Sequence, residues 1–259
     1  MDLHLSGKRV LITGASKGIG LAAAWSFARE GCDLCLTARS ADLLADNAGA
    51  ISASTGVTVD VHPADLRDAD DRRKVVEACG DIDILVNNAG DIPGGSLDRL
   101  DDAAWRAGWE LKVFGYIDMT RLVYARMRDQ GHGVVINDIG AAGERFDAGY
   151  IAGSTGNAAL MSFTRALGAR SINEGIRVVG VNPGLTATDR SVMMLGAMAA
   201  HRFGDAGRVD DVLAGFPGGR CATPEEIADA MVFLASDRSA YTSGVVLTID
   251  GGLCAAGGQ

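Results

Sequence analysis

The feature that most constrains this chain of 259 residues is a regular alternation of short apolar runs with longer amphipathic stretches. Seven runs rich in β-branched residues are expected to form strands, at 8–13, 33–37, 57–61, 82–86, 134–139, 177–181 and 245–249. Most of these runs are almost continuously apolar, which is typical of strands buried on both faces of a parallel sheet. Helices are expected between them, near 18–30, 41–54, 67–79, 102–129, 154–174 and 224–236. The alternation predicts one α/β domain over residues 1–259, with a doubly wound, seven-stranded parallel sheet and helices on both faces.

The C-terminal third departs from this rhythm once. Thr223 is expected to cap the last helix, because a proline and two glutamates that suit a first helical turn follow it. Before it, residues 186–219 interrupt the alternation and contain Met193, Met194 and Met198. An insertion of this length at the carboxyl ends of parallel strands predicts a lid over a ligand. An oligomer contact and a disordered loop are the alternatives.

Composition and charge exclude several classes of partner. The net charge of −9 argues against nucleic acid and anionic membranes, because both are bound through basic surface. No signal peptide follows Met1 and no apolar run reaches the length of a membrane span, so we expect a cytoplasmic protein. Cys32 and Cys35 form a C-x-x-C inside an expected strand, whereas redox pairs favour a helix N-terminus. We therefore expect buried thiols there, and no metal at the functional site.

A glycine-rich segment joins the first expected strand to the first expected helix. It reads Thr13-Gly14-Ala15-Ser16-Lys17-Gly18-Ile19-Gly20. Glycines in this position permit a tight turn and a close approach of the backbone to a pyrophosphate, which then lies at the helix N-terminus. The strand before the segment and the helix after it are the context that a dinucleotide-binding loop requires.

This loop and four later segments resemble the short-chain dehydrogenase/reductase family, whose fold is of the Rossmann type. The later segments are Asn87-Asn88-Ala89-Gly90, Asn182-Pro183-Gly184 with Thr186 and Thr188, Gly219-Arg220 with Pro224–Ala228, and Asp250-Gly251-Gly252. The match runs in order from residue 5 to about residue 252. The resemblance implies a nicotinamide cofactor held by Gly14, Ser16, Lys17, Gly18, Ile19, Gly20, Arg39, Asp65, Leu66, Asn88, Ala89, Gly90, Pro183, Gly184, Thr186 and Thr188. Within that set, Asp65 corresponds to the family's carboxylate on the adenine side; a helix cap is the alternative interpretation of this residue.

The end of the second strand favours NADP(H) over NAD(H). A fold that selects NAD commonly carries an acid here, which accepts hydrogen bonds from the ribose diol. This chain has Ala38 followed by Arg39, and Lys17 stands in the glycine loop. Two cations near one ribose suit a 2′-phosphate, although solvated loop cations are the plainer interpretation.

The catalytic positions depart from the family pattern, which comprises an Asn, a Ser and a Tyr-x-x-x-Lys sequence. Tyr150 keeps the tyrosine, which exchanges a proton with the substrate oxygen. The lysine position then falls on Ser154 and the serine position on Gly140. The segment between Gly140 and Tyr150 is also shorter than the family norm. We still expect Tyr150 and Ser154 to belong to the catalytic site.

Lys112 stands where the family's asparagine is expected, and it can replace the positive charge of the lysine that is missing at position 154. The chain has only four lysines, and the other three lie before the first strand, in the glycine loop and on an exposed-looking helix. Lowering a tyrosine pKa from about 10 to about 7 requires roughly 4 kcal/mol. One positive charge at about 4 Å supplies that at an effective dielectric near 20, whereas a neutral hydroxyl offers on the order of 1 kcal/mol. We therefore expect Lys112, rather than Ser154, to supply the missing charge; a surface lysine in a degenerate site is the alternative.

These features predict an oxidoreductase that transfers hydride between NADP(H) and a ketone or secondary alcohol with an apolar or aromatic body. Two alternatives stay open: an enoyl-type reductase of conjugated C=C bonds, and a non-catalytic NADP(H)-binding protein. Partners are expected to be a small-molecule substrate and further copies of the chain, as a homotetramer or homodimer through the helices at 102–129 and 154–174. No nucleic acid or membrane partner is expected.

Overall fold

The computed structural model describes residues 1–256, and its centre is a parallel sheet of seven strands in the order β3-β2-β1-β4-β5-β6-β7. The strands are β1 (Arg9–Thr13), β2 (Asp33–Thr37), β3 (Val59–Val61), β4 (Ile84–Asn87), β5 (Gly133–Asp138), β6 (Ile176–Pro183) and β7 (Val246–Ile249). The predicted seven-stranded, doubly wound parallel sheet is therefore confirmed. Because β1 is flanked by β2 and β4, the strand order reverses there, and the carboxyl ends of β1 and β4 border the crevice where such sheets bind ligands.

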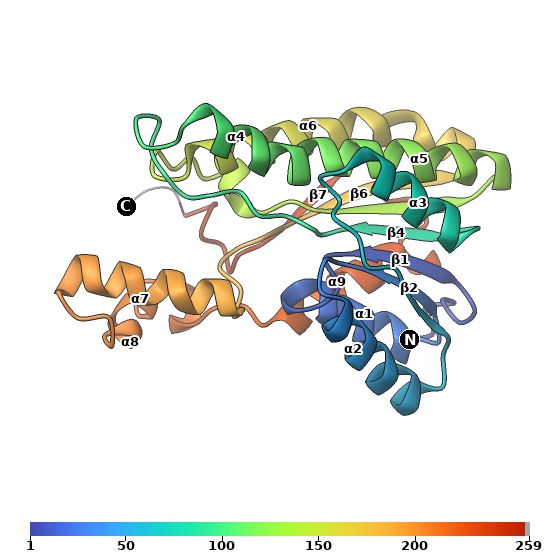
Figure 1. The fold of residues 1–259 in the computed structure, drawn as a ribbon, viewed down its shortest axis with the longest axis horizontal. Coiled ribbons are helices and arrows are strands. Elements are labelled where there is room, and N and C mark those ends of the chain that lie inside the picture. The colour runs from blue at the N-terminus through green and yellow to red at the C-terminus, as the bar shows by residue number, and fades with distance from the viewer. Residues whose placement is uncertain (257–259) are drawn as a thin grey trace.

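Helices cover both faces of the sheet (Figure 1). On one face lie α1 (Gly18–Arg29), α2 (Ala41–Thr55) and α9 (Pro224–Ala235), over a core that includes Phe27, Leu34 and Ile136. On the other lie α3 (Ala69–Cys79), α4 (Asp102–Trp109), α5 (Gly115–Gln130) and α6 (Ile151–Ser171). Thr223 caps α9 in a capping box with Glu226, as its sequence predicts. Burial of both faces explains why the strands are almost uniformly apolar.

The long helix expected at 102–129 is not regular. A π-helical turn, Glu110–Phe114, joins α4 to α5, and Lys112 lies at its centre. Such turns are rare and often mark functional sites. Arg72 of α3, which is buried, holds this turn by donating to Glu110 Oε1, to Asp118 Oδ2 of α5 and to the carbonyl of Leu66, at 3.3, 2.8 and 2.7 Å.

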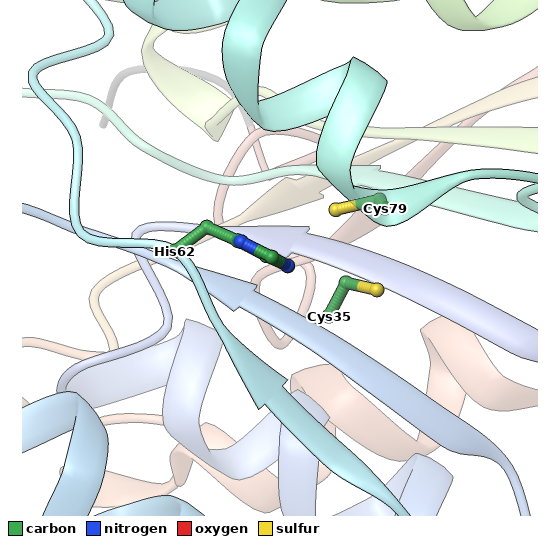
Figure 2. Close-up of side chains that lie close together, drawn as sticks. All are labelled: Cys35, His62 and Cys79. Carbon is green, nitrogen blue, oxygen red and sulfur yellow. The ribbon is translucent and has the colours of Figure 1, made fainter.

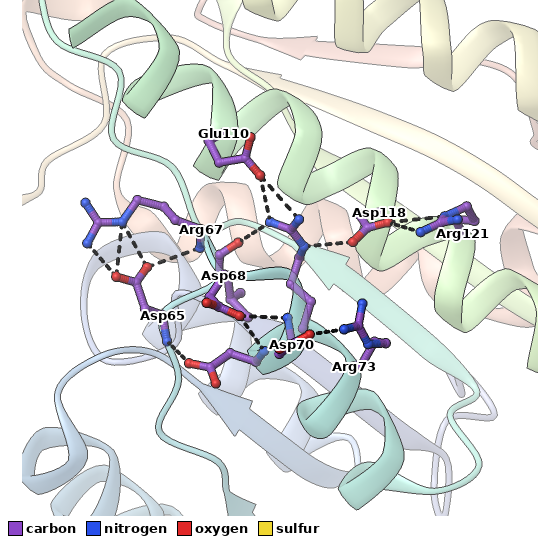
Figure 3. A network of polar contacts seen from close by, with 11 residues as sticks. Asp65, Arg67, Asp68, Asp70, Arg73, Glu110, Asp118 and Arg121 are labelled. Atoms are coloured by element: carbon purple, nitrogen blue, oxygen red, sulfur yellow. Dashed lines mark hydrogen bonds and ion pairs between the residues drawn. The ribbon is translucent and has the colours of Figure 1, made fainter. Parts of the chain in front are cut away.

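Figure 3 shows how this network continues to Asp65 and Arg67 in the segment after β3. Arg67 pairs with the Asp65 carboxylate at Nη2–Oδ2 2.5 Å, and the backbone N–H of Asp65 donates to Asp71 of α3. The network thus links the strand end expected to hold adenine with the helix that carries Lys112.

Residues 186–219 form two helices outside the sheet layers, α7 (Asp189–Phe203) and α8 (Val209–Leu213), drawn in orange in Figure 1. They enclose a small apolar cluster of their own around Leu195, Ala199 and Val212. Val192, Met193, Met194 and Met198 of α7 remain exposed. Within residues 1–256, none of the helices is both long enough and apolar enough to cross a membrane.

Candidate active site

The glycine loop after β1 is built around close backbone contacts. A side chain at Gly20 would bring its Cβ to 2.4 Å from the carbonyl oxygen of Gly14, and one at Gly14 would lie 2.8 Å from Nδ2 of Asn88. Helix α1 then begins with no side-chain cap and no acid in its first turn, so its N-terminal N–H groups are available to an anion. This cradle fits the diphosphate of a nicotinamide dinucleotide.

The end of β4 is tied to the end of β1 on the other side of the crevice. Thr13 Oγ1 accepts hydrogen bonds from the backbone N–H groups of Asn88 and Ala89, at 2.8 and 3.0 Å. The Asn88 amide donates back to the carbonyl of Thr13 at 2.8 Å. The sequence signature that contains Asn88, Ala89 and Gly90 therefore keeps the two strands at a fixed separation beside the glycine loop.

The remaining cofactor positions predicted from the sequence lie at the same edge of the sheet. Pro183 ends β6, Gly184 follows it, and Thr186 and Thr188 lead into α7. A side chain at Gly18 would meet Thr188 Cγ2 at 3.2 Å, so the turn after β6 touches the glycine loop. The positions brought together here are Gly14, Ser16, Lys17, Gly18, Ile19, Gly20, Asn88, Ala89, Gly90, Pro183, Gly184, Thr186 and Thr188.

The adenosine end of the crevice carries exposed cations. Lys17 and Arg39 are exposed, and neither takes part in an ion pair within residues 1–256. Asp65 lies near Arg39 but is paired with Arg67, whose hydrogen bonds hold the pKa of the Asp65 carboxyl below its usual value. Leu66 is buried behind it, and its carbonyl accepts from Arg72. The Asp65 carboxylate is therefore already paired on the side that faces Arg39.

Tyr150 lies immediately before α6, and its ring folds back over that helix. Its backbone forms a bridge with Gly95, in which Gly95 N–H donates to Gly149 O at 2.7 Å. A Cβ on Gly153 would lie 2.0 Å from Cε1 and Cζ of the Tyr150 ring. The ring therefore occupies the space that any side chain at residue 153 would fill. Trp109 supports this turn, since its indole N–H donates to Ala152 O at 3.0 Å.

Arg190 is the cation whose charge acts on Tyr150. It lies in the first turn of α7, donates to the Ile92 carbonyl at 2.6 Å and pairs with Asp91 at 3.4 Å. Burial raises the pKa of Tyr150, while the positive charge of Arg190 acts in the opposite direction. Sequence reasoning missed this residue. The sequence feature that could have identified Arg190 is its position. It lies two residues after Thr188, at the start of the helix that follows the nicotinamide-side turn.

Lys112 reaches into the crevice from the π-helical turn. Its ammonium donates to the Asp138 carbonyl at 3.2 Å and lies 5.4 Å from the centre of the Tyr116 ring, whose hydroxyl donates to the same carbonyl at 2.8 Å. A side chain at Gly90 would meet Cδ of Lys112 at 2.7 Å, so the lysine stem passes directly over Gly90. Burial lowers the pKa of Lys112, and it raises the pKa of the Asp138 carboxyl to about 6.

Ser154 and Asn157 have different surroundings on α6. Ser154 is buried, and its hydroxyl accepts from the Asp147 N–H at 3.3 Å, which attaches the preceding loop to the helix. Asn157, one turn beyond Gly153, donates through Nδ2 to the Gly140 carbonyl at 3.2 Å, and its buried Oδ1 has no partner within residues 1–256. The residues of α6 that face Gly140 and the Tyr150 ring are thus Asn157 and Gly153.

Comparisons with known proteins show what the chain is similar to. A family model described as "Enoyl-(Acyl carrier protein) reductase" matches residues 14–254. The chain is 32% identical over 257 residues to 3-oxoacyl-(acyl-carrier-protein) reductase FabG of Escherichia coli, covering 97% of this chain and 99% of the relative. It is 31% identical over 248 residues to acetoacetyl-CoA reductase of Allochromatium vinosum, covering 94% and 97%.

A solved structure extends the match to three dimensions. L-Sorbose reductase from Gluconobacter frateurii, complexed with NADPH and L-sorbose, superposes with a TM-score of 0.92 at 34% identity, covering 98% of this chain and 99% of that one. The motifs in the sequence, the strand order and these matches over nearly the whole chain lead to one assignment. The chain belongs to the short-chain dehydrogenase/reductase family, a family of NAD(P)-dependent oxidoreductases that act on CH–OH and carbonyl groups.

Proposed function

We propose that this protein is an NADP(H)-dependent oxidoreductase that interconverts a ketone and a secondary alcohol, with Tyr150 exchanging the proton of the substrate oxygen. The observation that carries the proposal is the placement of the Tyr150 ring over Gly153, where the charge of Arg190 acts on its hydroxyl. The bound cofactor would supply or accept the hydride at its nicotinamide ring. The protein's own task is then to orient the substrate and to move one proton.

Tyr150 and Arg190 suit proton donation at neutral pH. Because burial raises the pKa of Tyr150, its hydroxyl keeps its proton there and can give it to the oxygen of a carbonyl that is being reduced. The Arg190 charge opposes this rise, so it limits the cost of forming the tyrosinate after the proton has left. A unit charge at about 4 Å is worth up to about 4 kcal/mol at an effective dielectric near 20, and less for a partly exposed arginine.

Lys112 remains in the proposal as a second source of positive potential. Its ammonium, held by the Asp138 carbonyl beside Gly90, lies on the β4 side of the crevice, where a ribose or substrate hydroxyl would meet it. The contacts of Asn157 with Gly140 favour Asn157 over Ser154 as the residue of α6 that faces the reacting centre. Ser154 then acts by holding the loop before Tyr150.

NADP(H) is the proposed cofactor, since Lys17 and Arg39 are exposed, form no ion pair with the described residues 1–256, and lie in the glycine loop and just after β2. The solved L-sorbose reductase, which this chain resembles, holds NADPH. Arginine and lysine form charge-assisted hydrogen bonds with a 2′-phosphate, whereas a ribose diol calls for an acceptor. NAD(H) is the alternative.

The substrate is proposed to have an apolar or aromatic body that α7 covers. Val192, Met193, Met194 and Met198 expose their side chains on this helix, and Arg190 at its start already contacts the site. The matched model for enoyl reductases favours a second candidate, reduction of a C=C bond conjugated to a carbonyl. We further propose a homotetramer or homodimer through α4, α5 and α6, and a cytoplasmic location.

Initial rates with NADPH and with NADH would test the function. The panel should contain aliphatic ketones, aryl ketones and α,β-unsaturated ketones, with secondary alcohols and NADP⁺ for the reverse direction. The proposal expects carbonyl reduction with preference for NADPH. Turnover of the C=C bond alone would favour the enoyl-type candidate, and cofactor binding with no hydride transfer to any member would favour a non-catalytic protein.

A further inference from the structure

A second group of reactive side chains lies away from the crevice floor, on the α3 side of the sheet (Figure 2). Cys35 comes from β2, His62 directly follows β3, and Cys79 ends α3. Their Sγ atoms and one imidazole nitrogen all lie within 4.8 Å of one another. Both thiols are buried, and Figure 2 shows the three side chains lying close together. Three elements far apart in the sequence thus bring soft donors to one point.

The donors at this point lack the partners that such groups have elsewhere in the molecule. Nε2 of His62 is buried and has no hydrogen-bond partner within residues 1–256, and a buried polar atom without a partner destabilises the folded chain. By contrast, the Cys32 thiol donates to the Leu5 carbonyl at 3.3 Å and the Cys254 thiol lies 3.8 Å from the Ala141 carbonyl. Neither Cys35 nor Cys79 makes a backbone contact of this kind in the described chain.

We infer that Cys35, His62 and Cys79 form a binding site for a thiophilic divalent cation, with Zn²⁺ as the ion that fits best. Two thiolates and one imidazole are donors that Zn²⁺ prefers, and three protein ligands leave a fourth position for water. Bond lengths of about 2.3 Å to sulfur and about 2.0 Å to nitrogen put tetrahedral donors roughly 3.5–3.8 Å apart. The donor atoms, which lie within 4.8 Å of one another, would therefore have to approach by up to about 1.3 Å.

The charges around this cluster are compatible with a bound divalent cation. Two thiolates neutralise a divalent cation, so the bound site carries no net charge and can remain buried. The nearest charged groups are Arg9 and Asp60, which pair with each other at 2.7 Å, while Arg9 Nε donates to the Cys79 carbonyl at 2.8 Å.

The position of the site gives its expected role. Backbone hydrogen bonds join His62 N–H to Leu36 O and Ala64 N–H to Ala38 O, so the segment that carries His62 continues into the Asp65 loop at the adenosine end of the crevice. A bound ion would cross-link β2, the end of β3 and α3 directly beneath that loop. It would thus stabilise the fold, because a ligand that binds only the folded chain raises its unfolding temperature.

Titration of chelator-treated, reduced, full-length protein with Co²⁺ would test this inference. The expected result is one equivalent bound, with a thiolate-to-cobalt charge-transfer band in the near ultraviolet and the visible bands of tetrahedral cobalt, and displacement of Co²⁺ by Zn²⁺. The charge-transfer band should be lost or strongly reduced in Cys79→Ser and in His62→Asn. Cys32→Ser, which removes a neighbouring buried thiol outside the cluster, should bind as the wild type does.

The unfolding temperature should rise with Zn²⁺ concentration in the wild type and in Cys32→Ser, and not in His62→Asn. His62 is only partly buried, so its variant tests the site even where a cysteine variant fails to fold. Absence of stoichiometric binding would overturn the inference, as would binding that both Cys79→Ser and His62→Asn retain. A Cys35–Cys79 disulfide that persists under reducing conditions would overturn it as well.

Discussion

Gly153→Ala is the substitution that probes the placement of Tyr150 most sharply, because it leaves every proposed catalytic group in the chain. The added Cβ would lie 2.0 Å from two atoms of the Tyr150 ring, whereas ordinary contacts begin near 3.4 Å. The ring must therefore move by about 1.4 Å, the difference between these two distances. A displacement of about 1 Å at a reacting group can cost on the order of 100-fold in rate. We expect a loss of kcat/KM of that order.

The free energy of unfolding of Gly153→Ala should rise, although its activity falls. Alanine in a helix interior is favoured over glycine by about 1 kcal/mol, and the Tyr150 ring can swing toward the partly exposed side of the site. The variant should therefore remain folded and bind NADPH as the wild type does. Gly49→Ala in α2 is the matched control, since a Cβ there meets nothing within 4 Å, and it should leave the rate unchanged.

The assay is NADPH oxidation with the best ketone of the panel, accompanied by urea unfolding and cofactor titration of each variant. Adding Tyr150→Phe to Gly153→Ala should produce little further loss, because both changes remove the same group from its place. Wild-type activity in Gly153→Ala would refute the reasoning. So would a double variant whose losses simply multiply.

Three further outcomes are expected. Arg39→Ala should weaken NADPH binding by on the order of 1.5–3 kcal/mol and NADH binding little, as measured by fluorescence titration, and equal wild-type affinities for the two cofactors would contradict the assignment. Arg190→Gln should move the alkaline rise of alcohol oxidation to higher pH, because it removes the group that opposes the upward pKa shift of Tyr150, whereas Arg202→Gln on the same helix should not. Asp138→Asn should stabilise the protein at pH 8 by about 3 kcal/mol and hardly at pH 4. The folded-state pKa of this carboxyl is raised from 3.8 to about 6, so the folded protein favours the protonated carboxyl. The stability that the protonated Asp138 contributes is lost as the pH rises through 6, and an asparagine, which does not ionise, avoids this loss. Equal effects of Asp138→Asn at both pH values in urea unfolding would contradict this sign.

The strands, the glycine loop and the Thr223 cap could be predicted because local pattern decides each of them. Continuous apolar runs fix buried strands, and a Thr-Pro-x-Glu sequence satisfies a helix N-terminus without distant help. The π-helical turn at Lys112 could not be predicted, since 110–114 has no sequence feature that breaks an α-helix. It depends on Arg72, which reaches it from another helix.

The candidate site was predictable only in part, because its key contacts join distant segments. The charge of Arg190 acts on Tyr150, forty residues away in the sequence. The role of Gly153 is visible only in the structure, where the Tyr150 ring covers it. Cys32 and Cys35 form a C-x-x-C pair in the sequence but not in the structure. A spacing of three in a strand puts the two side chains on opposite faces, and they belong to different core clusters. His62 and Cys79, which lie beside Cys35 in the structure, come from other elements, and no local sequence pattern connects them with Cys35.

A single-turnover measurement would show whether Tyr150 moves the proton during hydride transfer. Wild type and Tyr150→Phe, each saturated with NADPH, would be mixed with the preferred ketone, and the decay of NADPH absorbance followed. General acid catalysis is worth roughly 10²- to 10⁴-fold, so Tyr150→Phe should be slower by that factor while its affinity for NADPH is unchanged. A Tyr150→Phe variant that transfers hydride as fast as the wild type would contradict the account.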